Sequence, residues 1–328
     1  MRSDLQWTSA QVVALRDLTP TVRELELQPE SGEATLHAPG AHLQVQVAVA
    51  PGLPQTRSYS LVGEGDGRVW RIAVKRLDDG RGGSRAMWRL AVGDRLPVSA
   101  PQNHFALDLS APGYLLVAGG IGITPLVLMA QRLGALSRRT GVPVRMLYGA
   151  RSPEELAYLP QLQAALGAQV QAHAGAAPMD VAAAIAALPE GGQLYACGPV
   201  PLLEALQRAW RDAARPPADL RFETFGSSGR LPAQAFEVRV PRHDLAITVP
   251  ADSTLLDALE AAGVETLWDC RRGECGLCAM DVLAVEGEID HRDVFLGEHE
   301  KRATTRICAC VSRAVGCLTL DSAWRPEP

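Results

Sequence analysis

The chain has 328 residues, of which 47% are hydrophobic and 21% charged, and its formal net charge is −5. These proportions exclude a disordered or fibrous protein, and the length predicts two or three domains of about 100–150 residues. Because no excess of basic residues is available to attract phosphates, the charge argues against a nucleic-acid partner and favours a small molecule or another protein.

The N-terminal third predicts an antiparallel β-barrel. Across residues 1–108, short segments in which apolar and polar residues alternate are separated by Gly and Pro. Period-two segments at this spacing are typical of antiparallel barrels. The segments are Gln11–Leu15, Val22–Leu27, His42–Val47, Trp70–Lys75 and Asp94–Val98.

Residues 109–227 predict a doubly wound α/β domain. From Tyr114 on, apolar segments of strand length alternate with segments of helical period. Such alternation implies a parallel sheet with helices on both faces, as in nucleotide-binding domains. The expected strands are 114–118, 144–148 and 193–197, and the expected helices run through 126–133 and 202–206.

A third domain is expected over residues 235–328. It follows a connector over 228–234, in a stretch whose Gly, Ser and Pro content indicates flexibility. The domain opens with two strands, 236–240 and 245–249, and a helix over 254–262 that ends at Gly263.

Six of the seven cysteines fall in this last domain. Cys270, Cys275 and Cys278 form a C-x₄-C-x₂-C pattern, and a fourth cysteine follows about thirty residues later, which is the plant-type iron–sulfur spacing. Gly273 and Gly276 give the loop the freedom to turn several thiolates toward one cluster. A zinc site is disfavoured, because zinc ligands usually come in pairs separated by two to four residues and Cys308 and Cys310 are separated by one. A thioredoxin-like motif at 275–278 is disfavoured, because it would need a βαβ context.

The fourth cluster ligand is open between Cys308 and Cys310. The run Cys310–Ala314, with a strand beginning at Leu318, resembles the segment after the last ligand in ferredoxins, where a closing strand follows. We therefore choose Cys310. Cys308 and Cys317 are then expected to be small buried hydrophobic residues.

A Gly-rich turn, Gly119–Pro125, follows the first strand of the α/β domain and opens a helix. Glycines let a ligand approach the backbone, and a helix N-terminus favours a pyrophosphate. Thr124 is expected to cap this helix, and Pro125 suits its first turn. The turn departs from G-x-G-x-x-G, so a turn without a ligand remains an alternative.

Three further segments carry candidate binding residues. Arg57–Ser60 offers an arginine for a phosphate, a tyrosine ring for a flat ligand and a serine hydroxyl for a ring nitrogen, although it could be an ordinary strand. Gly80–Ser84 is a candidate phosphate cradle of backbone N–H groups, or a solvated hairpin. Cys197–Pro199 ends a strand of the nucleotide domain, where ligands bind, but Cys197 could equally be a packing residue.

Taken in this order, the motifs resemble the phthalate dioxygenase reductase family, the reductase components of Rieske-type oxygenases that include vanillate demethylase reductases. The resemblance covers nearly the whole chain. It rests on Arg57–Ser60, Ile72–Arg76, Gly80–Ser84, Val117–Pro125, Cys197–Pro199, Phe222–Gly226, the cysteine loop, Glu286–Asp293 and Cys310–Ala314.

The resemblance implies a flavin-binding barrel, a nicotinamide-binding domain and a C-terminal β-grasp ferredoxin. It implies FMN rather than FAD, and NADH rather than NADPH, although Arg151 and Ser152 could grip a 2′-phosphate. The implied flavin residues are Arg57, Ser58, Tyr59, Ser60, Ala73, Val74, Lys75, Gly82, Gly83, Ser84, Thr124 and Phe225. The implied nucleotide residues are Gly119, Gly120, Ile121, Gly122, Pro125, Arg151, Cys197, Gly198 and Pro199.

This similarity predicts an NADH-dependent electron-transfer enzyme that reduces a Rieske-type oxygenase through its flavin and its 2Fe-2S cluster. Hydride transfer belongs to the cofactors, so no residue is expected to act as a catalytic acid or base. A cytochrome or separate ferredoxin is the alternative acceptor, and a metal-binding scaffold the remote one. The N-terminus has no signal pattern, and no segment of about 20 apolar residues is evident, so we expect a cytoplasmic monomer without a membrane partner.

Overall fold

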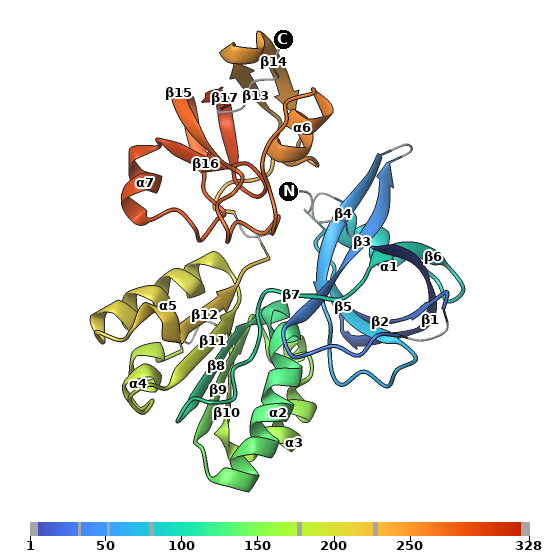
Figure 1. The fold of residues 1–328 in the computed structure, drawn as a ribbon, viewed down its shortest axis with the longest axis vertical. Coiled ribbons are helices and arrows are strands. Elements are labelled where there is room, and N and C mark those ends of the chain that lie inside the picture. The colour runs from blue at the N-terminus through green and yellow to red at the C-terminus, as the bar shows by residue number, and fades with distance from the viewer. Residues whose placement is uncertain are drawn as a thin grey trace. The chain divides into compact units, whose positions relative to one another are not determined.

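The computed structural model describes residues 6–31, 34–50, 53–78, 82–175, 179–225 and 229–322. The chain divides into two units, one over residues 5–223 and one from Thr224 on. Among the described residues, the first unit contains an antiparallel and a parallel sheet, and the second contains one mixed sheet (Figure 1). These three sheets confirm the fold class expected from the sequence.

The antiparallel sheet forms a nearly closed barrel. Its strands pair in the order β4-β3-β6-β1-β2-β5, with β7 beside β3, and a bridge between Leu61 and Ile72 brings its two ends together. Leu25 and Leu27 of β2 point into the barrel core, as their period-two spacing predicts. The elements are β1 (Trp7–Thr19), β2 (Val22–Pro29), β3 (Ala41–Ala50), β4 (Leu53–Ser60), β5 (Trp70–Lys75), α1 (Gly83–Arg89), β6 (Arg95–Ser99) and β7 (Gln102–Asn103).

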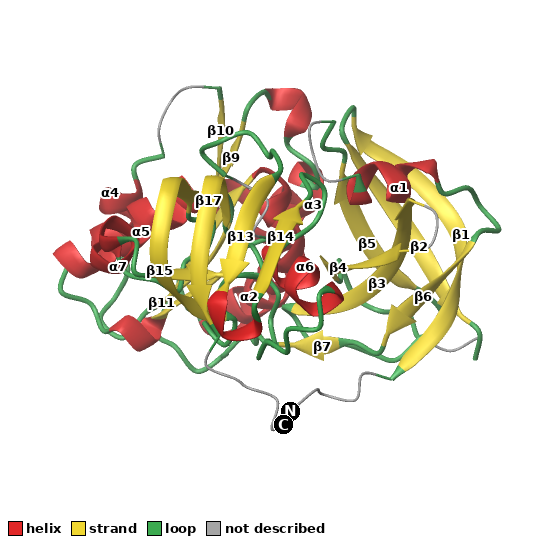
Figure 2. Ribbon diagram, turned by 90° about the horizontal axis from the view of Figure 1, so that it is seen from above, coloured by secondary structure: helices red, strands yellow, loops and turns green. Residues whose placement is uncertain are grey.

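Helix α1 packs at one end of the barrel, as Figure 2 shows. Ala86 and Met87 of this helix are buried in the barrel core. The indole N–H of Trp88 donates to the carbonyl of Val74 on β5 (2.9 Å). Helix α1 is therefore held against the end of β5.

The parallel sheet has the strand order β10-β9-β8-β11-β12. Helices α2 and α3 cover one face and α4 and α5 the other (Figure 1). Residues Tyr114–Ala118 of β8 are all buried, as expected for a central parallel strand covered on both faces. The elements are β8 (Tyr114–Gly119), α2 (Thr124–Thr140), β9 (Val144–Ala150), α3 (Leu159–Leu166), β10 (Val170–Ala174), α4 (Val181–Ala186), β11 (Gln193–Cys197), α5 (Val200–Asp212) and β12 (Leu220–Glu223).

One stretch corrects the expectation that no segment is long and apolar enough to span a membrane. Residues Gly120–Thr140, a 3₁₀ turn followed by α2, satisfy that test by length and hydropathy. In the structure 61% of this window is buried, because α2 packs on the parallel sheet. The apolar character of this stretch is therefore explained by its place in a protein core.

The second unit carries the β-grasp sheet, with the order β14-β13-β17-β15-β16. Strands β13 and β17 are parallel, and the other pairs are antiparallel. Leu255, Leu256 and Leu259 of α6 join the core of this unit. The elements are β13 (Phe236–Val240), β14 (Leu245–Val249), α6 (Leu255–Ala261), β15 (Ala279–Asp290), α7 (Glu298–Ala303), β16 (Arg306–Cys308) and β17 (Arg313–Asp321).

Candidate functional site

Two loops meet at the carboxyl ends of β8 and β11, which are neighbours in the parallel sheet. A Cβ atom on Gly122 would lie 2.2 Å from the carbonyl oxygen of Cys197, and one on Gly119 would lie 2.6 Å from Cδ of Pro199. Glycine is therefore required for this close approach. Chain order reverses between β8 and β11, and ligands bind at such switch points. The structure thus brings together the two segments that were predicted to bind a nucleotide.

The expectation that Thr124 caps α2 is wrong. A 3₁₀ turn over Gly120–Ile123 precedes the helix, and Thr124 is its first residue. The Thr124 hydroxyl donates to the carbonyl of Ile121 (3.0 Å) instead of accepting from a backbone N–H. Pro125 lies in the first helical turn, as predicted. The glycines allow the extra turn, so the helix begins without a side-chain cap.

The barrel residues predicted to bind a flavin lie on neighbouring segments. Arg57–Ser60 form the end of β4, and Ala73–Lys75 the end of β5. A Cβ atom on Gly83 would lie 2.9 Å from Nε of Arg57, so the start of α1 lies against this guanidinium. Ala73 shares a hydrophobic cluster with Ile123. Strand β5 therefore abuts the Gly-rich turn, while Gly80 of the predicted cradle lies outside the described residues.

Ser60 presents a polar atom that a ligand would satisfy. Its side chain is buried, and its hydroxyl has no hydrogen-bond partner among the described residues. A buried hydroxyl without a partner is costly and calls for an explanation such as a bound group. Ser58, two residues before Ser60 on β4, pairs with Gln44 of β3, as Ser60 pairs with His42. Beside Ser60, removal from water raises the pKa of Tyr59 to about 12, so Tyr59 is neutral at physiological pH. These residues fit a polar aromatic ligand.

Glu155 joins the two sheets of the first unit. It lies in the turn after β9, and its Oε2 accepts hydrogen bonds from Nζ of Lys75 (2.8 Å) and from the Thr21 hydroxyl (2.6 Å). Burial acts to raise the pKa of Glu155, but these bonds outweigh it and hold the pKa below its usual value. Arg151, four residues earlier, is exposed and adds a favourable charge. Glu155 was not predicted from the sequence, because no local pattern links it to Lys75.

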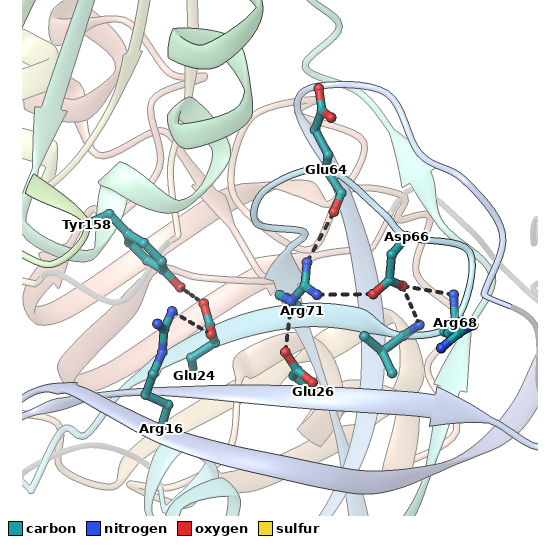
Figure 3. Close-up of polar contacts among 9 residues, drawn as sticks. Arg16, Glu24, Glu26, Glu64, Asp66, Arg68, Arg71 and Tyr158 are labelled. Carbon is teal, nitrogen blue, oxygen red and sulfur yellow. Dashed lines mark hydrogen bonds and ion pairs between the residues drawn. The ribbon is translucent and has the colours of Figure 1, made fainter. Parts of the chain in front are cut away.

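A second polar contact between the sheets involves Glu24 on β2. Its carboxylate, buried at 5% exposure, accepts from the Tyr158 hydroxyl (2.7 Å) and from Arg16 (2.9 Å), as Figure 3 shows. Nearby, Arg71 bonds Glu26, Asp66 and the carbonyl of Glu64. A cavity of about 540 Å³ opens beside these residues. Its charged groups are already paired with one another, so they orient the two sheets.

Five cysteines of the second unit, four of them expected as cluster ligands, form a group of two and a group of three. The thiol of Cys275 interacts with that of Cys270 and shifts its pKa, and the thiols of Cys308 and Cys310 do the same to Cys278. Among the described residues, no three His, Cys, Asp or Glu side chains are arranged to hold one metal ion. A 2Fe-2S cluster held by four cysteines uses two thiolates per iron, which the group of two and two members of the group of three can supply.

Backbone N–H groups also point at these sulfurs. The N–H of Arg272 donates to Sγ of Cys270 (3.4 Å). Burial raises the pKa of Cys270 to about 11, and these donors act in the opposite direction. In the group of three, hydrogen bonds from the Cys308 and Cys310 thiols lower the pKa of Cys278 to about 3. Donors of this kind stabilise thiolates, which are the form that binds iron.

The cluster loop is anchored by residues that its cysteine spacing does not reveal. Arg271, at φ +51°, bonds Asp257 (2.6 Å) and Glu260 (2.9 Å) of α6 and stacks on Trp268. Glu274 accepts from the backbone N–H of Thr224 (2.5 Å). Phe225, predicted beside the flavin ring, belongs to this second unit. The loop conformation is therefore set by α6 and by the first residues of its own unit.

The comparisons with known proteins cover nearly the whole chain. Residues 238–315 match the family described as 2Fe-2S iron-sulfur cluster binding domain. The chain is 42% identical over 293 residues to the phenoxybenzoate dioxygenase subunit beta of Ectopseudomonas oleovorans, with 86% of each chain covered. It is 37% identical over 310 residues to the heme-dependent oxidative N-demethylase beta subunit of Ectopseudomonas mendocina (strain ymp), covering 93% of this chain and 95% of that one.

Among solved structures, the chain is similar to phthalate dioxygenase reductase, described as a modular structure for electron transfer from pyridine nucleotides to 2Fe-2S. The two share 31% identity and a TM-score of 0.76, with 96% of this chain and 98% of that one covered. A likeness of this extent includes both units and all three sheets.

Proposed function

We propose a specific electron path for this chain, which belongs to the phthalate dioxygenase reductase family of NAD(P)H-dependent oxidoreductases. The path runs from NADH to FMN, then to the 2Fe-2S cluster, and ends at a Rieske-type terminal oxygenase. The observation that carries the proposal is the grouping of five thiols in the second unit, because two irons can each take two thiolates from it. We propose the domains 1–108, 109–227 and 235–328 for these three tasks, with 228–234 as a linker.

The flavin site that we propose uses the ends of β4 and β5 together with the start of α1. The Ser60 hydroxyl, which has no partner in the part of the chain that the structure describes, supports a bond to the flavin ring, and Arg57 beside Gly83 supports a phosphate contact. One such phosphate anchor suits FMN, which carries a single phosphate. The remaining proposed residues are Ser58, Tyr59, Ala73, Val74, Lys75, Gly82, Ser84, Thr124 and Phe225.

The nucleotide site that we propose lies over the two loops at the ends of β8 and β11. The turn after β9 supports NADH over NADPH, because it carries two acidic residues, Glu154 and Glu155, within four residues of Arg151. Carboxylates bond a ribose hydroxyl and repel a 2′-phosphate. The proposed residues are Gly119, Gly120, Ile121, Gly122, Pro125, Arg151, Cys197, Gly198 and Pro199.

The cluster ligands that we propose are Cys270, Cys275, Cys278 and Cys310. When bound, the flavin takes hydride from the nicotinamide and the cluster takes electrons singly. The chain's own residues hold and orient these groups, and Cys197 shapes the nicotinamide pocket without reacting. Because hydride transfer needs no proton at a side chain, we assign no catalytic acid or base.

The terminal acceptor is inferred from the relatives. The name of the phenoxybenzoate dioxygenase subunit supports an oxygenase, and we propose a Rieske-type oxygenase for this chain. The name of the heme-dependent N-demethylase subunit favours a haem protein as the second candidate. We propose that the chain itself acts as a cytoplasmic monomer.

The test uses the full chain with iron and sulfide supplied in the absence of air. NADH should bleach the flavin and cluster absorbance together. Cys310→Ala should lose the cluster while its flavin is still reduced, and Cys317→Ala, the same change at a thiol on β17, should retain both. Absence of acid-labile sulfide in the wild-type chain contradicts the proposal. The ratio of kcat/KM for NADH and NADPH tests the coenzyme, and reduction of a Rieske oxygenase against a haem protein tests the acceptor.

A further inference from the structure

The connector that precedes β13 is bonded to the unit that carries the cysteines. Its Gly, Ser and Pro content predicts flexibility, and over 229–234 it forms no helix or strand. The backbone N–H groups of Arg230 and Leu231 nevertheless donate to the Asp290 carboxylate (2.9 and 3.4 Å). The carbonyl of Leu231 accepts from Nη2 of Arg292 (3.1 Å). These bonds hold the backbone of the connector while most of its side chains stay exposed.

A second buried arginine holds the end of the connector. Arg313 is 2% exposed, and it donates to the carbonyls of Gln234 (2.9 Å) and Pro250 (2.9 Å). It lies opposite Asp290 where β15 pairs with β17. Asp290, Arg292 and Arg313, here called the connector clamp, are therefore buried together at one end of this strand pair.

Within the clamp, Asp290 and Arg292 form a buried ion pair. Nε and Nη2 of Arg292 lie 2.8 and 2.7 Å from Oδ2 of Asp290. Such a pair is a poor source of net stability, because removing both charges from water offsets most of their attraction. Its effect is geometric: a Cβ atom on Gly229 would lie 2.2 Å from that oxygen and 2.3 Å from that Nε, so the connector passes directly against the pair.

We propose that Asp290 and Arg292 are positioning residues for electron transfer, because they shorten the tether on which the cluster unit is carried. This inference rests on the proposed function, in which the reduced flavin loses one electron and the oxidised cluster gains it. Strand β12 ends at Glu223, and with the clamp closed the free tether ends at Gly229 instead of Gln234. A flexible tether that still spans its two ends gives a higher effective concentration when it is shorter. The clamp therefore speeds electron transfer from flavin to cluster.

Two variants open the clamp in different ways. Asp290→Asn replaces one carboxylate oxygen by an amide N–H₂ group, which then faces the donors that the carboxylate had bound. Gly229→Ala pushes the connector away from the ion pair without removing a charge. The control is Asp281→Asn, the same change on the same strand, at a carboxylate that is 71% exposed and lies 3.6 Å from Arg306.

The full chain with its cofactors is mixed with NADH, and the absorbance of flavin and cluster is followed by stopped flow. In both clamp variants the flavin should be reduced at the wild-type rate, since no clamp residue is among those proposed for flavin or nucleotide. Electron transfer from flavin to cluster should slow several-fold, a split that a general loss of stability would not produce. Trypsin should cleave after Arg230 several-fold faster, because the N–H of Leu231 is released. Asp281→Asn should match the wild type in all three rates.

Three results overturn the proposal. Unchanged cleavage after Arg230 in both variants shows that the clamp does not hold the connector. Faster cleavage with wild-type electron transfer to the cluster shows that a held connector does not position the cluster. Slower transfer together with a shifted midpoint potential of the cluster in Gly229→Ala shows that the driving force is responsible.

Should Asp290→Asn fail to fold, Gly229→Ala decides by the same three criteria. All of these results are distinct from failure of the proposed function, in which the wild-type chain itself takes up no cluster.

Discussion

Glu24 illustrates how a single buried carboxylate joins the barrel to the parallel sheet. Tyr158 and Arg16 both donate to it, and burial together with the Glu24 charge raises the pKa of Tyr158, so the phenol remains a donor across the physiological range. A charge-assisted bond in such a site is stronger than one in water. The contact therefore fixes the angle between the surfaces that carry the two proposed ligand sites.

Glu24→Gln should destabilise the chain by about 1–3 kcal/mol, because the amide weakens both bonds at a buried site. The matched control is Glu64→Gln, which breaks an ion pair with Arg132 in which both side chains are more than half exposed. Such exposed pairs contribute about 0–1 kcal/mol. Urea unfolding followed by tryptophan fluorescence measures both. Equal losses in the two variants contradict the structural role of Glu24.

Gly276 is a residue-scale requirement of the cluster loop. It has φ +73°, and a Cβ atom there would lie 2.2 Å from the ring of Phe295. Gly276→Ala should therefore both strain the backbone and displace the Phe295 ring. Gly263→Ala is the control that separates these effects. Gly263 also has a positive φ (+81°), but nothing lies within 4 Å of its Cβ position.

Gly263→Ala should cost only about 1 kcal/mol and leave cluster content unchanged, since its penalty is the left-handed backbone alone. Gly276→Ala should lower the iron and sulfide bound per chain. Quantifying both elements after anaerobic reconstitution measures the difference. Full cluster content in Gly276→Ala is incompatible with the close packing of Phe295 on this loop.

At the scale of elements, α6 holds the cluster loop through Arg271. The short helix is capped by Thr254, whose hydroxyl accepts from the N–H of Asp257 (2.9 Å). Two acidic residues of α6 then bind the guanidinium from one side while Trp268 stacks on it at 3.9 Å. A helix that contributes no cysteine thus determines where Cys270 lies.

Arg271→Ala should speed the loss of cluster absorbance on warming several-fold, because the loop is released from α6 and left to fluctuate. Arg239→Ala removes an arginine of the same unit whose partner Glu286 is 67% exposed, and should behave as the wild type. Bleaching rates at a fixed temperature compare the two. If Arg271→Ala bleaches no faster than this control, α6 does not support the cluster.

Over the whole first unit, Glu155 connects β5, the β1–β2 turn and the segment after β9. Of these parts, β5 carries proposed flavin residues and the segment after β9 carries the proposed nucleotide residue Arg151. Its lowered pKa has a definite sign for stability: the contribution is present above the ordinary glutamate pKa of 4.5 and is lost as the pH falls toward the lowered value.

Glu155→Gln should destabilise the chain by about 1 kcal/mol at pH 7, and the difference from the wild type should narrow below pH 4.5. The melting temperatures of the two proteins are compared from about pH 3.5 to about pH 7.5, a range that includes the reference pKa of glutamate. A difference that stays constant with pH would mean that the Glu155 charge is not responsible.

The sequence by itself determined the three sheets and the cluster spacing. Period-two apolar residues such as Leu25 and Leu27 must point into a barrel, and a fully apolar strand such as Tyr114–Ala118 must be covered on both faces. The Gly-rich turn and the cysteine loop are likewise visible as local patterns, although the close approach of Gly119 and Gly122 to the segment 197–199 comes from the fold. The site assignments built on them stay predictions.

Only the tertiary structure decided which distant groups meet. Thr124 satisfied the composition rule for a cap, yet the preceding 3₁₀ turn placed it inside the helix. Glu155 and Lys75 lie 80 residues apart in the sequence, and Tyr158 and Glu24 lie 134 apart. No local pattern encodes such pairs.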